Sequence, residues 1–228
     1  MKSKFSILMV LLAGAFTSVA QEQAYWIRYY NQFTLSPKWV WHNEFDERRL
    51  INPDRQAQFF IHTHLHYLLN KKFDVAMGFN HARTQSSANE TIPEWRTWQE
   101  INFNPTITSR LKYNFRYRLD ERFIHNTSAG LLEDGYRFVL RHRIRAQAFY
   151  RVGEKERITF RVSDELMLNT TSGVDTYDQN RIYGSVEIQL IKSVSIEVGY
   201  LNQNVNRNGV KTTFNVLRTT VYHRLKRN

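Results

Sequence analysis

The sequence contains no cysteine, and after its first 20 residues it has no long run of apolar residues. Without cysteine the chain cannot form a disulfide, a thiolate metal site or a lipid-modified cysteine behind an export signal. A membrane-spanning helix needs about 20 consecutive apolar residues, and the mean hydropathy of −0.54 is that of a water-soluble chain. These absences predict no spanning helix. A transmembrane β-barrel still fits them, because only every second residue of its strands contacts lipid.

An export signal is predicted at the start of the chain. Two lysines precede a mostly apolar segment at residues 5–16, and a small-x-small cleavage motif ends at Ala20. The apolar segment is too short for an uncleaved membrane anchor. We expect residues 1–20 to be a signal peptide that is cleaved after Ala20, which leaves a single domain at residues 21–228.

Basic residues outnumber acidic ones. The net charge is +11 in the full sequence and +9 once the two lysines of the signal peptide are removed. Basic proteins can bind nucleic acid, but here the charges are spread at every second position rather than clustered in a tail or a helix. Together with export, this spacing argues against a nucleic-acid partner.

Residues 111–120 alternate apolar and polar side chains without a break. Successive side chains of a strand point to opposite faces, so this segment is a strand with one apolar and one ionic face. The pattern recurs along nearly the whole mature chain and predicts an all-β fold, a transmembrane antiparallel up-and-down β-barrel. The predicted strands are at residues 24–33, 39–48, 56–69, 73–82, 94–104, 108–123, 136–150, 158–169, 178–191, 194–205 and 210–226. Bacterial single-chain barrels have an even number of strands, so we expect 10–12, with one strand missed or the first segment not a full strand of the wall.

The connections are predicted to alternate between short periplasmic turns and longer external loops, as in known barrels. The short ones are residues 34–38, 70–72, 105–107, 151–157 and 192–193. The others, mostly longer and polar, lie around residues 52–54, 83–93, 124–135, 170–177 and 206–209. Aromatic residues near strand ends are expected to form girdles at the membrane interfaces. They are Tyr25, Trp26, Trp39, Trp41, Phe73, Trp95, Phe123, Tyr136 and Tyr150.

Two neighbouring predicted strands carry rows of basic residues on one side. An arginine that faces lipid at the bilayer midplane costs about 2–4 kcal/mol, so these rows must face the lumen. The predicted basic wall consists of Arg110, Lys112, Arg116, Arg118, Arg122, Arg137, Arg141, Arg143 and Arg145. Acidic partners across the lumen lower the free energy of crowding like charges. The predicted acidic partners are Glu44, Asp46, Glu94, Glu100, Glu165, Glu187 and Glu197.

The basic wall has two interpretations. In one, arginine–glutamate ladders fill and brace a narrow, mostly closed barrel, as in other barrels of this size. In the other, arginines without partners line a pore that concentrates anions. The excess of basic over acidic residues keeps both open.

His62, His64 and His66 occupy alternate positions, so on a strand they share one face, which is predicted to be inward. Imidazoles suit Zn, Ni or Cu, but the Cα atoms of this row would be about 6.5 Å apart or more. Such a row cannot surround one ion without ligands from neighbouring strands. We therefore expect pore-lining hydrogen bonders, with no metal and no other cofactor.

A hydrolase at the membrane surface would need a histidine near a serine with an orienting group. His125 and Ser128 supply these residue types together with Asn126, but in a predicted loop without strand-fixed spacing. We expect no enzymatic activity and no catalytic residue, with a lipid-active enzyme that uses this pair as an alternative.

Three segments carry a family resemblance. Residues 94–100 read E-W-R-T-W-Q-E, residues 117–122 read Y-R-L-D-E-R, and residues 141–145 read R-H-R-I-R. This order resembles the uncharacterised family called "domain of unknown function 2490". The resemblance covers essentially the mature chain and implies an exported β-rich protein of the Bacteroidetes type, with no established activity. Within the first segment we expect Glu94, Arg96 and Glu100 to form a bracing cluster.

These observations predict a protein of the outer membrane of a Gram-negative bacterium. Its expected partners are outer-membrane lipids and small anionic solutes, and its expected role is that of a narrow pore or a plugged structural barrel. A further alternative is a soluble periplasmic barrel that binds a ligand, in which the arginine strands would face water and the aromatic residues would line the pocket.

Overall fold

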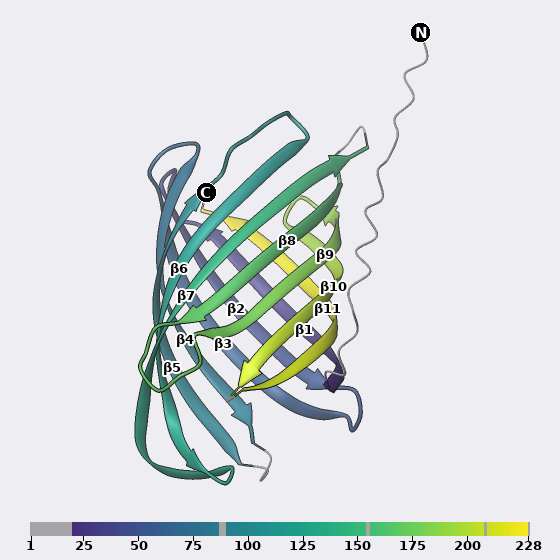
Figure 1. Ribbon diagram of the computed structural model, residues 1–228. Coiled ribbons are helices and arrows are strands. Elements are labelled where there is room, and N and C mark those ends of the chain that lie inside the picture. The colour runs from purple at the N-terminus through teal and green to yellow at the C-terminus, as the bar shows by residue number, and fades with distance from the viewer. Residues whose placement is uncertain (1–19, 87–89, 154–155, 208, 228) are drawn as a thin grey trace.

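The computed structural model describes residues 20–86, 90–153, 156–207 and 209–227 as one closed β-barrel (Figure 1). The strands are β1 (Ala20–Thr34), β2 (Trp39–Leu50), β3 (Arg55–Leu68), β4 (Phe73–Gln85), β5 (Thr91–Phe103), β6 (Leu111–Ser128), β7 (Leu131–Val152), β8 (Ile158–Asn169), β9 (Tyr177–Ile191), β10 (Val194–Arg207) and β11 (Val210–Lys226). None of the described residues forms a helix that is long and apolar enough to cross a membrane. The predicted signal peptide lies outside the described residues except for Ala20.

The barrel is closed by a parallel pair. Each strand from β1 to β11 pairs antiparallel with the next along the chain. An odd number of alternating strands leaves the first and last running in the same direction, and β1 pairs with β11 in parallel from Ala20↔Thr212 to Thr34↔Lys226. The expectation that the first segment is not a full strand of the wall, or that a strand was missed, is therefore wrong. The count of eleven within the predicted range is confirmed.

The two faces of the wall have opposite character. On β7, Ile144 is 54% exposed on the outer side, while Arg141 and Arg143 are buried on the inner side. The alternative in which the arginine strands face water is therefore wrong in this respect. Strand alternation sets this arrangement, because every second residue turns to the lumen.

Carboxylates on the outer face have local partners. Glu121 accepts a hydrogen bond from Thr97 at 2.6 Å, and Asp164 accepts one from Asn180 at 2.6 Å.

The two longest strands, β6 and β7, form a hairpin that extends beyond the predicted strand ends. Residues 124–135 are mostly strand rather than the predicted loop, and the turn falls at Ala129 and Gly130. Both residues have positive φ, of 50° and 84°, which matches the turn type that suits the twist of paired strands. We call the end of the barrel with this turn the hairpin end.

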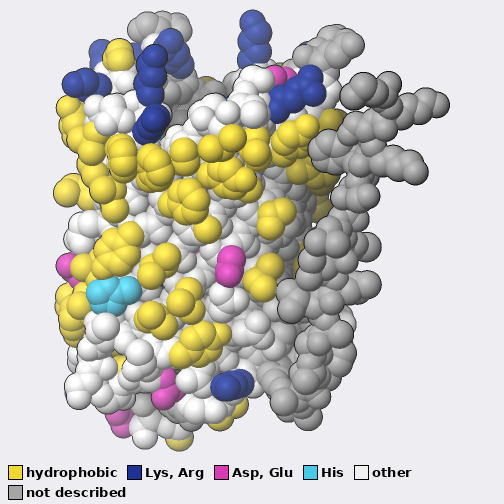
Figure 2. Space-filling view, turned by 45° about the horizontal axis from the view of Figure 1, so that its top comes forward, with side chains coloured by type: hydrophobic (Ala, Val, Ile, Leu, Met, Phe, Trp, Pro, Cys, Tyr) yellow, Lys and Arg dark blue, Asp and Glu magenta, His cyan; other side chains and the backbone are white. Residues whose placement is uncertain are grey.

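The opposite end carries many exposed lysines and arginines, and we call it the basic end. In Figure 2 these side chains gather at the top, above a band of hydrophobic side chains. They are Lys38, Lys71, Lys72, Arg110, Arg151, Arg157, Lys192, Lys226 and Arg227. Connections at both ends contain 2–7 residues, so the predicted contrast between short and long connections is wrong.

Most of the predicted girdle residues are exposed on the outer face, with Trp39 at 41% and Tyr150 at 47%. Trp26 is an exception, since it is 6% exposed and lies in a buried cluster with Leu50, Tyr183 and neighbouring apolar residues. It occupies an inward position of β1, so its prediction as a girdle residue is wrong.

Candidate functional site

The barrel interior holds a network of charged side chains. Of the predicted basic wall, seven residues line one or both of two interior cavities: Arg116, Arg118, Arg122, Arg137, Arg141, Arg143 and Arg145. Lys112 is half-buried and lines neither. Arg110 does not belong to the wall, because it is exposed in the turn before β6, where Thr108 accepts hydrogen bonds from the amides of Arg110 and Leu111.

Each predicted acidic partner is held by arginine. The pairs are Glu44–Arg28, Asp46–Arg48, Glu94 with Arg96 and Arg122, Glu100 with Arg116 and Arg118, Glu165 with Arg116 and Arg143, Glu187 with Arg161 and Arg224, and Glu197–Arg161. The predicted bracing cluster splits into separate ion pairs. Arg96 bonds Glu94 on its own strand, whereas Glu100 pairs with Arg116 and Arg118 of β6.

Asp120 is the most connected carboxylate of the network, and its side chain is fully buried. It accepts hydrogen bonds from Arg118 Nε at 2.7 Å and Arg141 Nη2 at 2.6 Å. Arg143 Nη1 and Arg96 Nη1 lie 3.5 and 3.8 Å from its Oδ2. One carboxylate thus balances guanidinium groups from β5, β6 and β7, a role that the sequence analysis did not assign to it.

Several ion pairs pass over an intervening strand and so project into the lumen. Arg141 of β7 bonds Asp178 of β9 at 2.9 Å, and Arg116 of β6 bonds Glu165 of β8. Arg224 of β11 reaches Glu187 of β9 at 2.6 Å. These contacts place charged side chains inside the lumen.

The lumen contains two cavities. A basic-end cavity of about 510 Å³ is lined by residues such as Gln32, Asn104 and Gln147, and a hairpin-end cavity of about 450 Å³ by residues such as Arg137 and Asp175. Nine residues line both cavities, and we call them the waist. They are Trp26, Arg28, Glu44, Arg116, Arg118, Arg145, Glu165, Arg181 and Arg218. With six arginines and two glutamates, the waist has a formal charge of +4.

Three waist arginines make no ion pair with any described residue: Arg145, Arg181 and Arg218. Arg145 donates to Asn114 Oδ1 at 2.8 Å. Arg181 lies 5.4 Å from the Trp26 ring, and Arg218 lies 5.0 Å from the Tyr183 ring. The Nε of each arginine is buried without a hydrogen-bond partner among the described residues. An anion at the waist would supply the acceptor that these groups lack.

The sequence analysis missed Arg28, Arg161, Arg181 and Arg218 as lumen residues. The inward faces of β1, β9 and β11 mix arginine with aromatic residues such as Trp26, Tyr183 and Tyr222, so polarity alone does not separate the two faces of those strands. Strict alternation counted from a neighbouring inward residue could have found them.

The predicted histidine row is divided between the cavities. His64 and His66 line the basic-end cavity together with His42 of β2, whereas His62 lines the hairpin-end cavity and bonds Asn80 at 2.8 Å. The candidate set His62, His64 and His66 is therefore wrong in its first member.

His125 and Ser128 lie near the end of β6 rather than in a loop. His125 Nδ1 bonds the backbone oxygen of Asn126 at 3.2 Å, and its ring packs on Tyr136. Among the described residues no hydrogen bond joins His125 to Ser128, so the structure does not bring this pair together.

Removal of the Asp120 charge tests how far the network stabilises the fold. Asp120→Asn leaves the guanidinium groups of Arg118 and Arg141 uncompensated, and we expect a loss of about 3–5 kcal/mol in the free energy of unfolding. Denaturant unfolding of the refolded barrel measures it. Glu121→Gln, on the outer face of the next position, is the matched control and should change stability by about 1 kcal/mol or less. Equal losses for both variants would contradict a stabilising network.

Comparison with known proteins identifies the family. The family model described as "Protein of unknown function (DUF2490)" matches residues 23–214, from β1 into β11. The comparison with curated proteins gave no match. The match confirms the family resemblance carried by the segments of β5, β6 and β7, which contribute much of the charge network. The chain belongs to the DUF2490 family.

Proposed function

We propose that this protein is a non-enzymatic outer-membrane β-barrel that provides a narrow passage for small anions. The observation that carries the proposal is the position of Arg145, Arg181 and Arg218, which line both cavities without an ion-pair partner among the described residues. A solute that moves from one cavity to the other must pass these groups.

The outer surface supports a place in the membrane. Large hydrophobic side chains such as Ile144, Val162 and Leu217 are more than half exposed around the wall. A soluble barrel would leave this surface in water, whereas lipid would cover it. Lysines and arginines at the basic end lie next to the hydrophobic band (Figure 2), where they could contact lipid headgroups.

The charge of the waist supports a preference for anions. Six arginines face two glutamates there, and walls of low dielectric strengthen the field of the excess positive charge. Arg28 and Arg116 are neutralised by Glu44 and Glu165. The remaining field comes mainly from arginines that are free to bind and release a solute, and conduction requires such reversible binding.

The ion pairs that project into the lumen support a narrow passage. They also favour a second candidate, a plugged barrel with a structural role, in which the network closes the waist. The two candidates differ in whether ions pass through the inserted protein.

Single-channel recording of the mature protein in a planar bilayer tests the proposal. Under a KCl gradient we expect small steps with a reversal potential that reports chloride preference. Replacement of Arg145, Arg181 and Arg218 by Gln should lower the ratio of anion to cation permeability by about tenfold, which corresponds to about 1.4 kcal/mol. Arg137→Gln, at the hairpin-end cavity but outside the waist, is the control and should retain most of the preference.

Two results would contradict the passage. Silence from protein shown to be inserted would favour the plugged barrel. An unchanged reversal potential in the triple variant would show that the waist arginines do not select the ion.

Membrane insertion has its own test in a pair of substitutions on β7. Ile144 lies in the middle of the strand and Leu131 at the hairpin tip, and both are 54% exposed. In phospholipid vesicles, Ile144→Arg should lower the free energy of unfolding by about 2–4 kcal/mol, and Leu131→Arg by about 0–1 kcal/mol. Similar small losses at both positions would show that no lipid covers the middle of the wall.

A further inference from the structure

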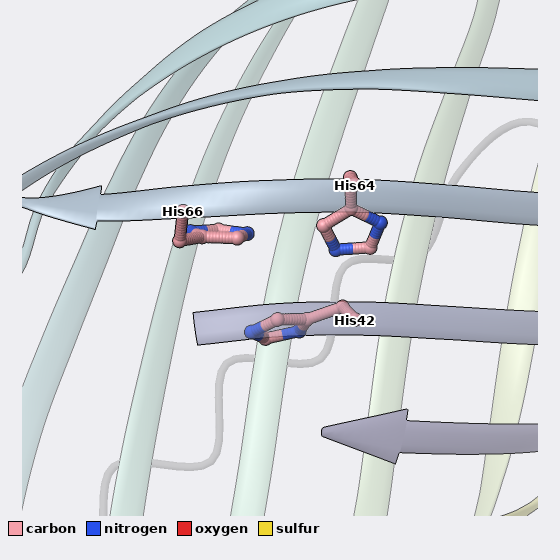
Figure 3. A group of neighbouring side chains, drawn as sticks. All are labelled: His42, His64 and His66. Carbon is pink, nitrogen blue, oxygen red and sulfur yellow. The ribbon is translucent and has the colours of Figure 1, made fainter. Parts of the chain in front are cut away.

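Three histidines converge in the basic-end cavity, apart from the waist arginines. Figure 3 shows His42 on β2 beside His64 and His66 on β3. One ring nitrogen from each lies within 4.8 Å of the others. His42 and His64 are buried, and His66 is nearly so.

The strand register explains why they meet. His42 is the direct cross-strand partner of His64, and opposed residues have Cβ atoms about 4.5–5.5 Å apart. His66 follows two positions later on the same face, and its ring stacks on His42 with centroids 4.5 Å apart. The neighbouring strand thus supplies the ligand that a single row of histidines lacks.

His66 is held as metal-bound histidines commonly are. Its Nδ1 bonds Asp74 Oδ1 at 2.9 Å, and Asp74 in turn accepts hydrogen bonds from Asn102 and Asn104 at 2.9 and 2.8 Å. A carboxylate on one ring nitrogen orients the imidazole and raises the basicity of the other nitrogen. Nε2 of His66 is therefore the atom available to a metal.

The glycine at position 78 leaves room for the side chain of His64. A Cβ added to Gly78, which lies opposite His64 on β4, would come within 2.6 Å of the His64 side chain and within 2.4 Å of the Trp98 ring. The ring of His64 packs against Trp98, with centroids 5.0 Å apart. Its Nδ1 is buried without a hydrogen-bond partner among the described residues, which is expensive for a polar atom.

Charge balance also points to a cation. The buried carboxylates are Asp46, Asp74, Glu94, Glu100, Asp120, Glu165, Glu187 and Glu197. All of them except Asp74 pair with arginine, and within the described part of the chain the ion-pair partner of Asp74 is His66. Asp74 therefore lacks the permanent positive charge that the other buried carboxylates receive from arginine, and a divalent cation on the histidines would supply it.

From this geometry we infer that His42, His64 and His66 form a binding site for a divalent transition metal, of which Zn²⁺ is the test case. Zinc binds imidazole nitrogens at about 2.0–2.1 Å, so ring nitrogens that lie up to 4.8 Å apart must move closer together to bind it. Glu100 Oε1 lies 3.9 Å from His66 Nε2 and can provide a fourth ligand. The site would tie β2 to β3 and does not depend on ion conduction.

Zinc titration of the tag-free refolded mature protein tests the site. Isothermal calorimetry should find one Zn²⁺ per barrel, and X-ray absorption of the zinc-loaded protein should show three imidazole nitrogens at about 2.0–2.1 Å. His64→Gln should weaken binding at least tenfold. Asp74→Asn, which removes the positioning carboxylate, should weaken it by about 10–100-fold.

His62→Gln is the matched control, because His62 is on the same strand but lines the other cavity, and it should bind zinc as the parent does. The proposal is overturned if His62→Gln and His64→Gln have the same affinity, or if the parent binds no zinc. An absorption spectrum without three imidazole ligands overturns it independently of how well any variant folds.

Discussion

Every arginine that turns into this barrel needs a negative partner, and the interior is arranged around that requirement. Alternation along the strands sends apolar side chains outward and charged ones inward. Charges enclosed by protein are stabilised only when they are paired and hydrogen-bonded. Asp120 meets the requirement for arginines from three strands. Pairs such as Arg141–Asp178 meet it by passing over the strand between them. The two interior cavities adjoin at the waist.

The two proposed ion-binding sites lie where this pairing of arginines with carboxylates is incomplete. At the waist, Arg145, Arg181 and Arg218 lack a carboxylate partner among the described residues, and in the basic-end cavity Asp74 lacks an arginine. An anion would balance the three arginines, and a cation would balance Asp74. They lie at different levels of one lumen, on different strands, so a single barrel can hold both kinds of ion without a conflict of charge. The odd strand number does not disturb this arrangement, because the parallel β1–β11 pair continues the inward alternation around the wall.

Much of the fold could be predicted from the sequence, because strands that face apolar and ionic surroundings carry a strict alternation, as in residues 111–120. The hairpin of β6 and β7 could not, since Glu133, Asp134 and Gly135 have the composition of a loop yet form a bulge within β7, between the pairs His125↔Tyr136 and Thr127↔Leu132. The arginines of the lumen were predicted where most inward residues of a strand are basic, as on β7 around Arg143. It was missed at Arg181, on a strand that mixes arginine with aromatics. It was also missed at His42, whose neighbours depend on a cross-strand register that local sequence does not encode.

The central claim is that Arg145, Arg181 and Arg218 bind exchangeable anions rather than carboxylates of the protein. Anomalous diffraction from crystals of the detergent-solubilised protein grown in bromide tests it most directly. The account predicts a bromide peak within hydrogen-bond distance of the guanidinium group of Arg145, Arg181 or Arg218, between the two cavities. Bromide found only at the exposed basic end, with these three guanidinium groups turned onto carboxylates, would contradict it.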